Sequence, residues 1–370
     1  MKKMILLMIM LLSFTAIKAN ADDISYIKGA KSGILIEETT NTILYEKNIH
    51  DKLAPASMTK IMTMLLTFEA INQNVMSFDT MLTTSEYAAS MGGTQVYLKV
   101  GEKISVDEAL KCVAIASAND CAVLLGEYIS GSEIEFVKQM NSKAKELGAN
   151  NTNFTDCTGL NEENHYTTSY DLALISRDLI MNYPKVFDYT NSREDYIRKD
   201  TSSPFWLVNT NKLIGNLEEI KGLKTGHTSF AGYCITLYMK KDNISLISVV
   251  FGYDTAPKRN AESLELLRYG ANNYKLNCIM KKGTVIDEIN HILYKDIITI
   301  TINEDISTVT KKNKLNAYSY DYKFDIISNS GKLIIMDNNI KIMEKEIIKE
   351  NMVKKSFLEL IISLFEVVIG

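Results

Sequence analysis

The chain has 370 residues, of which 46% are hydrophobic and 23% charged, and its formal net charge is -4. This composition is typical of a globular protein, and the length allows two domains with a full hydrophobic core in at least one. The slight acidity and the absence of a long basic block argue against nucleic acid as a partner.

The first 21 residues have the pattern of a secretory signal peptide. Two lysines precede an apolar run over residues 4–17, and Ala19-Asn20-Ala21 supplies the small-x-small sequence at which such peptides are cleaved. Lys18 is unusual beside a cleavage site, so an uncleaved N-terminal anchor is the alternative. In both cases we expect the body of the protein outside the cytoplasmic membrane.

The five cysteines and four histidines are scattered along the chain. There is no C-x-x-C pair and no histidine cluster beside a cysteine, so the sequence predicts neither a metal site nor a cofactor. An odd number of cysteines in an exported chain cannot form a closed disulfide framework. Cys112, Cys121 and Cys234 lie in apolar runs, and we expect them to be small buried side chains.

Residues 32–48 predict two short strands around a polar turn, and the most informative stretch of the chain follows them. Pro55 precedes an apolar run that continues to Ala70 without glycine or proline, which predicts a buried helix. Ser57 then falls in the first turn of that helix, with Lys60 three residues on and on the same face. A hydroxyl beside a poorly solvated amine is what a nucleophile and its base require. Ser-x-x-Lys alone is a common chance match, and the alternative is a helix start with an exposed lysine.

A corner between two apolar helices supplies the next polar groups. Ser105 is expected to begin the first helix through a capping box with Glu108, and the second helix is expected to start at about Cys121. Between them, Ser117 and Asn119 are predicted to point into a cleft near the nucleophile. The alternative is an ordinary helix–helix turn in which Asn119 or Asp120 caps the second helix.

Further elements frame this region. A Gly-bounded loop with a short strand is predicted within residues 91–101, and a helix over 133–147 that ends at the C-cap signal Gly148. The polar segment 153–168 is expected to be a loop before an amphipathic helix over 169–181.

A third polar element is predicted on a strand. Residues 222–228 lead into two apolar runs separated by a turn, which predicts an antiparallel hairpin. Its first strand carries Lys224, Thr225 and Gly226, which offer a cation, a hydroxyl and a position where a ligand backbone can approach closely. Arg259 opens the next predicted helix, just after the hairpin.

From about residue 275 the pattern changes to strict alternation over short runs such as 298–302 and 318–326. This pattern predicts a small, separate all-β domain without a catalytic cluster. The last stretch, 351–370, predicts an amphipathic helix that is too short to span a bilayer. It either lies in the membrane interface, which we favour because its end is so apolar, or packs on the β-domain.

Together the three polar elements resemble the active-site motifs of serine penicillin-binding proteins and class A β-lactamases. More narrowly, the chain resembles the low-molecular-mass penicillin-binding proteins that are D-alanyl-D-alanine carboxypeptidases, closely over residues 24–275. Tyr97–Glu102 and His165–Thr168 share this resemblance, whereas Ala118 stands where the family usually has glycine. The three motifs, in chain order, are Ser57-x-x-Lys60, Ser117-x-Asn119 and Lys224-Thr225-Gly226.

The resemblance implies an α/β (α+β) fold with an antiparallel sheet flanked by helices, and a small C-terminal all-β domain. It implies a location at the outer face of the cytoplasmic membrane, in the cell-wall compartment. The expected division is a signal peptide over 1–21, a catalytic domain over 22–274, a β-rich domain over 275–350 and a membrane-anchoring amphipathic helix over 351–370.

The resemblance also implies removal of the terminal D-alanine from peptidoglycan stem peptides, with β-lactam antibiotics as covalent inhibitors. Ser57 would attack, Lys60 would accept its proton, and Ser117 would relay a proton to the leaving amine. Lys60 must then be a buried base of lowered pKa with Lys224 as a cationic neighbour. The N–H groups of Ser57 and His227 would form the oxyanion hole. The residues implied in substrate binding are Asn119, Lys224, Thr225, Gly226, His227 and Arg259.

Two other functions fit parts of the pattern. A class A β-lactamase deacylates with the glutamate of a Glu-x-x-Leu-Asn loop, but the comparable region here reads Gly159-Leu160-Asn161-Glu162-Glu163. Fast β-lactam turnover is therefore not expected. The other alternative is a non-catalytic peptidoglycan-binding protein of the same fold, and the three intact motifs argue against it.

Overall fold

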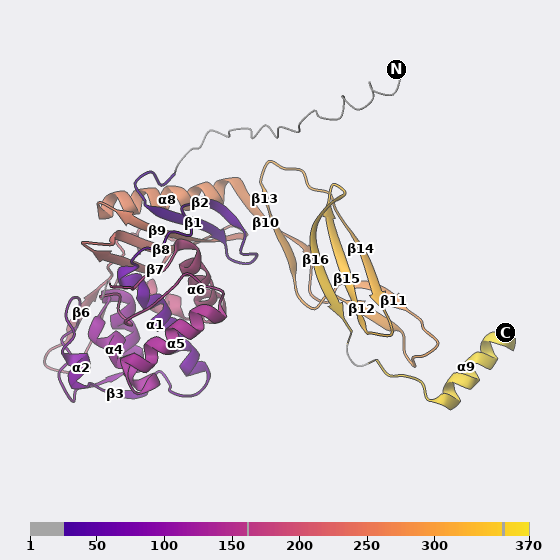
Figure 1. Cartoon of the computed structure of the whole chain (residues 1–370), viewed down its shortest axis with the longest axis horizontal. Coiled ribbons are helices and arrows are strands. Elements are labelled where there is room, and N and C mark those ends of the chain that lie inside the picture. Colours follow the sequence, from indigo (N-terminus) through magenta and orange to yellow (C-terminus); the bar gives the residue numbers. More distant parts are fainter. Residues whose placement is uncertain (1–25, 161–162, 350–351, 370) are drawn as a thin grey trace, which may run out of the picture.

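The computed structural model describes residues 26–160, 163–349 and 352–369. The predicted signal peptide over residues 1–21 lies outside this range. Figure 1 shows a large body of helices and strands, a smaller group of strands after it, and one helix at the end of the chain. The predicted fold class is confirmed, because an antiparallel sheet flanked by helices is followed by small antiparallel sheets.

The central sheet has five antiparallel strands in the order β2-β1-β9-β8-β7. The predicted N-terminal hairpin and the predicted strand pair after residue 220 are both present. After residue 220 the chain forms three consecutive antiparallel strands, β7, β8 and β9, where two were predicted. Strand β1 pairs with β9. The strands are β1 Ser32–Glu37, β2 Ile43–Lys47, β7 Ile220–Thr228, β8 Gly232–Lys241 and β9 Ile244–Tyr253.

Both faces of this sheet are covered by helices (Figure 1). Helix α8 (Ala256–Asn273) packs on the face that carries Leu35. Helices α1 (Lys60–Asn72) and α6 (Ser169–Asn182) lie on the opposite face, which carries Ile34. Because successive side chains of a strand point to opposite faces, a sheet covered on both sides reads as a continuous apolar run. All six residues of β1 are buried for this reason.

The remaining helices of the large body surround α1. The predicted capping box is confirmed, since Ser105 Oγ accepts the N–H of Glu108 and the Glu108 carboxylate accepts the N–H of Ser105. Gly148 follows α5 with a φ of +79°, as its C-cap signal predicted. The helices are α2 Glu86–Ala89, α3 Val106–Lys111, the π-helix η2 Cys112–Ala116, α4 Asn119–Ser130, α5 Glu133–Glu146 and α7 Val186–Thr190. Two small strand pairs accompany them: β3 Met81–Thr83 pairs with β4 Lys103–Ser105, and β5 Glu194–Ile197 pairs with β6 Phe205–Val208.

The short strand predicted within residues 91–101 is wrong, since this segment is a loop. The buried Asp120 carboxylate accepts the backbone N–H groups of Val96 and Leu98, so a side chain takes the place of a neighbouring strand. Tyr97 between them has a φ of +58°, which a strand cannot contain.

After α8 the chain forms antiparallel sheets that share a small hydrophobic core around Ile300, Leu333 and Ile335. The last helix, α9 (Phe357–Ile369), stands apart from these strands in Figure 1. No helix within the described ranges is long and apolar enough to cross a membrane. The division of the chain into domains stays a prediction. The strands are β10 Tyr274–Met280, β11 Val285–Ile289, β12 Ile298–Thr301, β13 Ile306–Lys311, β14 Tyr318–Asp325, β15 Ser330–Asp337 and β16 Ile340–Ile348.

Candidate active site

Ser57 lies on a short 3-10 turn, η1 (Ala56–Thr59), rather than inside the first turn of the α-helix as predicted. Helix α1 begins directly after it, at Lys60. The i, i+3 spacing still brings the two side chains together, and Lys60 Nζ donates to Ser57 Oγ over 3.2 Å. Ser57 remains partly exposed at the surface of this otherwise buried turn, where a substrate can reach it.

Lys60 is fully buried, which excludes the alternative of an exposed lysine at a helix start. Its ammonium group also donates to Asn119 Oδ1 over 2.6 Å and to the Thr158 carbonyl over 2.8 Å. Burial lowers the pKa of Lys60 to about 8, although nearby carboxylates, including Asp156, favour its charged form. When Lys60 is a neutral amine, Asn119 Oδ1 and the Thr158 carbonyl can accept its two hydrogens. The nitrogen lone pair is then directed at Ser57 Oγ.

The corner after η2 places the second motif beside Lys60. Ser117 ends the π-helix with a φ of +67°, and α4 then starts at Asn119. Asn119 is not an N-cap, because Ala118 occupies that position and the Asn119 side chain bridges two other segments. Its Oδ1 accepts from Lys60 and its Nδ2 donates to the Gly92 carbonyl over 2.7 Å. Ser117 is 4% exposed, and within the described residues its hydroxyl makes no hydrogen bond.

The third motif lies on β7, at the edge of the central sheet. A Cβ atom on Gly226 would lie 2.6 Å from the Pro55 carbonyl oxygen, so the strand touches the start of the turn that carries Ser57. Thr225 donates its hydroxyl to Thr210 Oγ1 over 2.7 Å. Lys224 is buried, and its Nζ donates to the Thr225 carbonyl over 3.0 Å.

Lys224 is the second cation that the sequence predicted near the base. Burial holds the pKa of Lys224 well below its usual range, and the charges of Lys60 and Arg259 lower it further. Carboxylates near Lys60, including Asp156, favour its charged form, whereas the charges that act on Lys224 disfavour its charged form. A bound anion would therefore favour the charged form of Lys224.

His227 and Arg259 flank this strand in different ways. The His227 side chain is exposed, and its ring stacks on Tyr233 with the ring centroids 3.9 Å apart. Arg259 is buried beneath the sheet, where its Nη1 donates to the carbonyl of Cys234, the residue paired with Gly226. Burial lowers the pKa of Arg259 to about 10. Arg259 makes no hydrogen bond to Thr225 or Lys224 in the described structure.

Sequence reasoning missed the contribution of the loop between α5 and α6. This loop places the Thr158 carbonyl on Lys60, and Asp156 Oδ1 holds its shape by accepting the N–H groups of Thr158 and Gly159. The one signal for this loop in the sequence is His165, which belongs to the segment His165–Thr168 that resembles the family. In the described residues no carboxylate accepts a hydrogen bond from Lys60.

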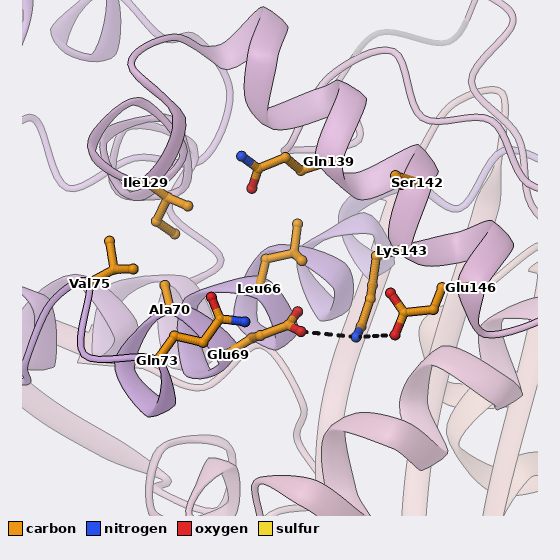
Figure 2. Close-up of a pocket in the computed structure, with 10 residues that line it drawn as sticks. All are labelled: Leu66, Glu69, Ala70, Gln73, Val75, Ile129, Gln139, Ser142, Lys143 and Glu146. Carbon is orange, nitrogen blue, oxygen red and sulfur yellow. Dashed lines mark hydrogen bonds and ion pairs between the residues drawn. The ribbon is translucent and has the colours of Figure 1, made fainter.

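A polar pocket of about 290 Å³ lies elsewhere, between α1, α4 and α5, and contains none of the motif residues (Figure 2). Lys143 on α5 bridges Glu69 on α1, at 3.1 Å, and Glu146, at 2.9 Å. The ion pair with Glu69 joins the two helices, whereas the pair with Glu146 lies within α5. Among the residues that the structure describes, no group of three or more His, Cys, Asp or Glu side chains is arranged to hold a metal ion.

Comparisons with known proteins agree with this arrangement. A sequence model of the family described as D-alanyl-D-alanine carboxypeptidase matches residues 17–255. The chain is 46% identical over 286 residues to the D-alanyl-D-alanine carboxypeptidase DacF of Bacillus subtilis, which covers 77% of this chain and 73% of that protein. It is similar to the crystal structure of penicillin-binding protein 5 from Haemophilus influenzae, with a TM-score of 0.77 and 26% identity over 88% of this chain and 98% of that chain. It is also similar to penicillin-binding protein D2 from Listeria monocytogenes in the ampicillin-bound form, with a TM-score of 0.59 and 30% identity over 65% of this chain and 97% of that chain.

Proposed function

The chain belongs to the D-alanyl-D-alanine carboxypeptidase family, and we propose that it removes the terminal D-alanine of peptidoglycan stem peptides through an acyl-enzyme on Ser57. It is a serine-type carboxypeptidase and a penicillin-binding protein of the cell wall, and it therefore acts outside the cytoplasm. The observation that carries the proposed mechanism is the contact of a fully buried Lys60 with Ser57 Oγ at 3.2 Å.

In the acylation step, neutral Lys60 takes the proton of Ser57, and Ser57 Oγ bonds to the carbonyl carbon between the two terminal D-alanines. The N–H groups of Ser57 and His227 are proposed to hold the developing oxyanion, which the close approach of Gly226 to the nucleophile turn supports. When the C–N bond breaks, Ser117 passes the proton from Lys60 to the leaving amine of D-alanine. The free, buried hydroxyl of Ser117 is suited to this relay.

In the deacylation step, a water molecule gives its proton to Lys60 and attacks the ester carbonyl. The Ser57 oxygen leaves with that proton, and the shortened peptide departs with a new carboxylate. This cycle is the Ser-Lys variant of serine acyl transfer, which needs no histidine or aspartate base.

Substrate recognition is proposed to use the open edge of β7 and its cations. The free C-terminal carboxylate would accept the Thr225 hydroxyl and face Lys224, whose charged form such an anion favours. Arg259 would add positive potential from beneath the strand rather than by direct contact. Asn119 would hold a substrate amide while it keeps Lys60 in place.

Two measurements test this proposal. Purified protein should release D-alanine from a synthetic pentapeptide ending in D-Ala-D-Ala, and fluorescent penicillin should label it with a long-lived bond. Ser57→Ala should abolish both. Labelling without D-alanine release would refute the substrate, no labelling would support a non-catalytic peptidoglycan-binding protein, and brief labelling with rapid turnover would support a β-lactamase.

We further propose that α9 holds the enzyme at the membrane surface. Phe357, Leu358 and Phe365 on this helix are 79%, 68% and 62% exposed. Its polar side is occupied, since Glu359 pairs with Lys295 at 2.7 Å. The apolar side is thus left for lipid. Deleting residues 351–370 should abolish flotation with anionic lipid vesicles and leave D-alanine release from the soluble pentapeptide unchanged; retained flotation would refute the anchor.

A further inference from the structure

The loop of residues 155–159 runs along the start of α1 and contacts it through backbone carbonyls. The Thr158 carbonyl accepts from Lys60 Nζ, and one turn further the Cys157 carbonyl accepts the hydroxyl of Thr63 over 2.7 Å. A third contact comes from His165, whose Nε2 lies 2.8 Å from Thr59 Oγ1. This last contact reaches the turn that carries the nucleophile.

The hydrogen bonds around His165 fix its tautomer. The backbone N–H of Thr155 donates to His165 Nδ1 over 3.1 Å, so Nδ1 carries no proton. Thr59 uses its single hydroxyl hydrogen to donate to the Ala56 carbonyl over 2.8 Å. The proton of the neutral ring therefore lies on Nε2 and is donated to Thr59 Oγ1. Burial lowers the pKa of His165, which keeps the ring neutral at pH 7.

This chain of hydrogen bonds ends on a strained residue. Ala56 has a φ of +48°, a left-handed conformation that is strained for an L-residue with a side chain. Its carbonyl is held between the Thr59 hydroxyl and Gly159, where a Cβ atom would come within 1.8 Å of that oxygen. The next residue is Ser57, so any relaxation of Ala56 moves the nucleophile relative to Lys60.

We propose that His165 is a positioning residue for Ser57. Through Thr59 it holds the Ala56 carbonyl, keeps the turn in its left-handed conformation and so keeps Ser57 Oγ within reach of Lys60. His165 makes no hydrogen bond to Ser57 or Lys60, and it transfers no proton in the reaction. This inference rests on the proposed role of Ser57 as nucleophile.

The experiment compares variants that break the chain with variants that keep it. His165→Leu and Thr59→Val remove one link each, and the double variant removes both partners. His165→Gln retains an amide donor for Thr59, and Thr59→Ser retains the hydroxyl. His291→Leu, in the C-terminal strands, is the matched control for loss of a histidine. For each folded variant we would measure the rate of acylation by fluorescent penicillin from pH 6 to 10, and kcat and KM for D-alanine release.

The expected result is a fall in acylation rate and kcat of about 10- to 100-fold for each breaking variant, which is the effect of a small displacement of a reacting group. KM and the midpoint of the pH profile should stay unchanged, and the double variant should be no slower than the worse single variant. His165→Gln, Thr59→Ser and His291→Leu should remain within a few-fold of wild type.

Wild-type rates in both His165→Leu and Thr59→Val, or additive losses in the double variant, would overturn the inference. A shifted pH midpoint would also overturn it, because it would indicate proton transfer by His165. Should His165→Leu fail to fold, the rates of Thr59→Val alone test the inference, because this variant leaves the ring in place. If wild-type protein is not labelled at Ser57, the proposed function fails instead, so the two failures are distinguishable.

Discussion

The rate at which Ser57 is acylated should follow the ionisation of Lys60. In the proposed mechanism the neutral amine is the base, so the rate should rise about tenfold per pH unit below the pKa of Lys60 and level off above it. With that pKa at about 8 instead of the ordinary 10.5, the midpoint of the profile is expected near pH 8.

The magnitude follows from the two pKa values. At pH 7, about one molecule in eleven holds neutral Lys60 when the pKa is about 8, against about three in ten thousand at 10.5. Burial thus raises the reactive fraction about 300-fold, which corresponds to about 3 kcal/mol.

A charge-removing substitution tests the electrostatic origin of this midpoint. Asp156 favours the charged form of Lys60, so Asp156→Asn should move the midpoint below that of wild type. The amide oxygen of asparagine can still accept the loop N–H groups of Thr158 and Gly159, which preserves the loop. Asp188→Asn, at an exposed position of α7, is the matched control and should leave the midpoint unchanged.

The assay is the second-order rate constant of labelling by fluorescent penicillin between pH 6 and 10, with circular dichroism at each pH to confirm that the protein stays folded. A rate that does not change with pH, or a midpoint near 10.5, would contradict the role of Lys60 as a buried base. An upward shift in Asp156→Asn would contradict the electrostatic account.

Three further substitutions have expected outcomes. Gly159→Ala should lower the acylation rate at least tenfold, since its Cβ would displace the Ala56 carbonyl; labelling kinetics check this, and a wild-type rate would show that the turn tolerates movement. Gly226→Ala, with its Cβ 2.6 Å from the Pro55 carbonyl, should slow D-alanine release and destabilise the fold by about 1–3 kcal/mol, measured by urea unfolding. Ser105→Ala removes the capping box of α3 and should cost about 1 kcal/mol in the same unfolding assay, with labelling unchanged.

Much of this protein could be predicted because it depends on local sequence. The capping box at Ser105 and the helix end at Gly148 are set by residues within one turn of each other. The spacing of Ser57 and Lys60 likewise put the two side chains on one face before any long-range contact was known. Strand β1 was predicted from its own residues, and its run of buried side chains reflects the helices that cover both faces of the sheet.

The tertiary structure decided what the spacing of residues could not. Lys60 is suited to act as a base because it is fully buried and because Asn119 and Thr158, 59 and 98 residues away in the chain, accept its hydrogen bonds. Thr158 contributes a backbone carbonyl, which cannot be inferred from the residue type. His165 contacts Thr59 from 106 residues further along the chain. The sequence by itself determined which chemical groups are present and in what order. The pKa values of these groups and the orientation of their side chains depend on burial and on long-range contacts, which only the folded chain creates.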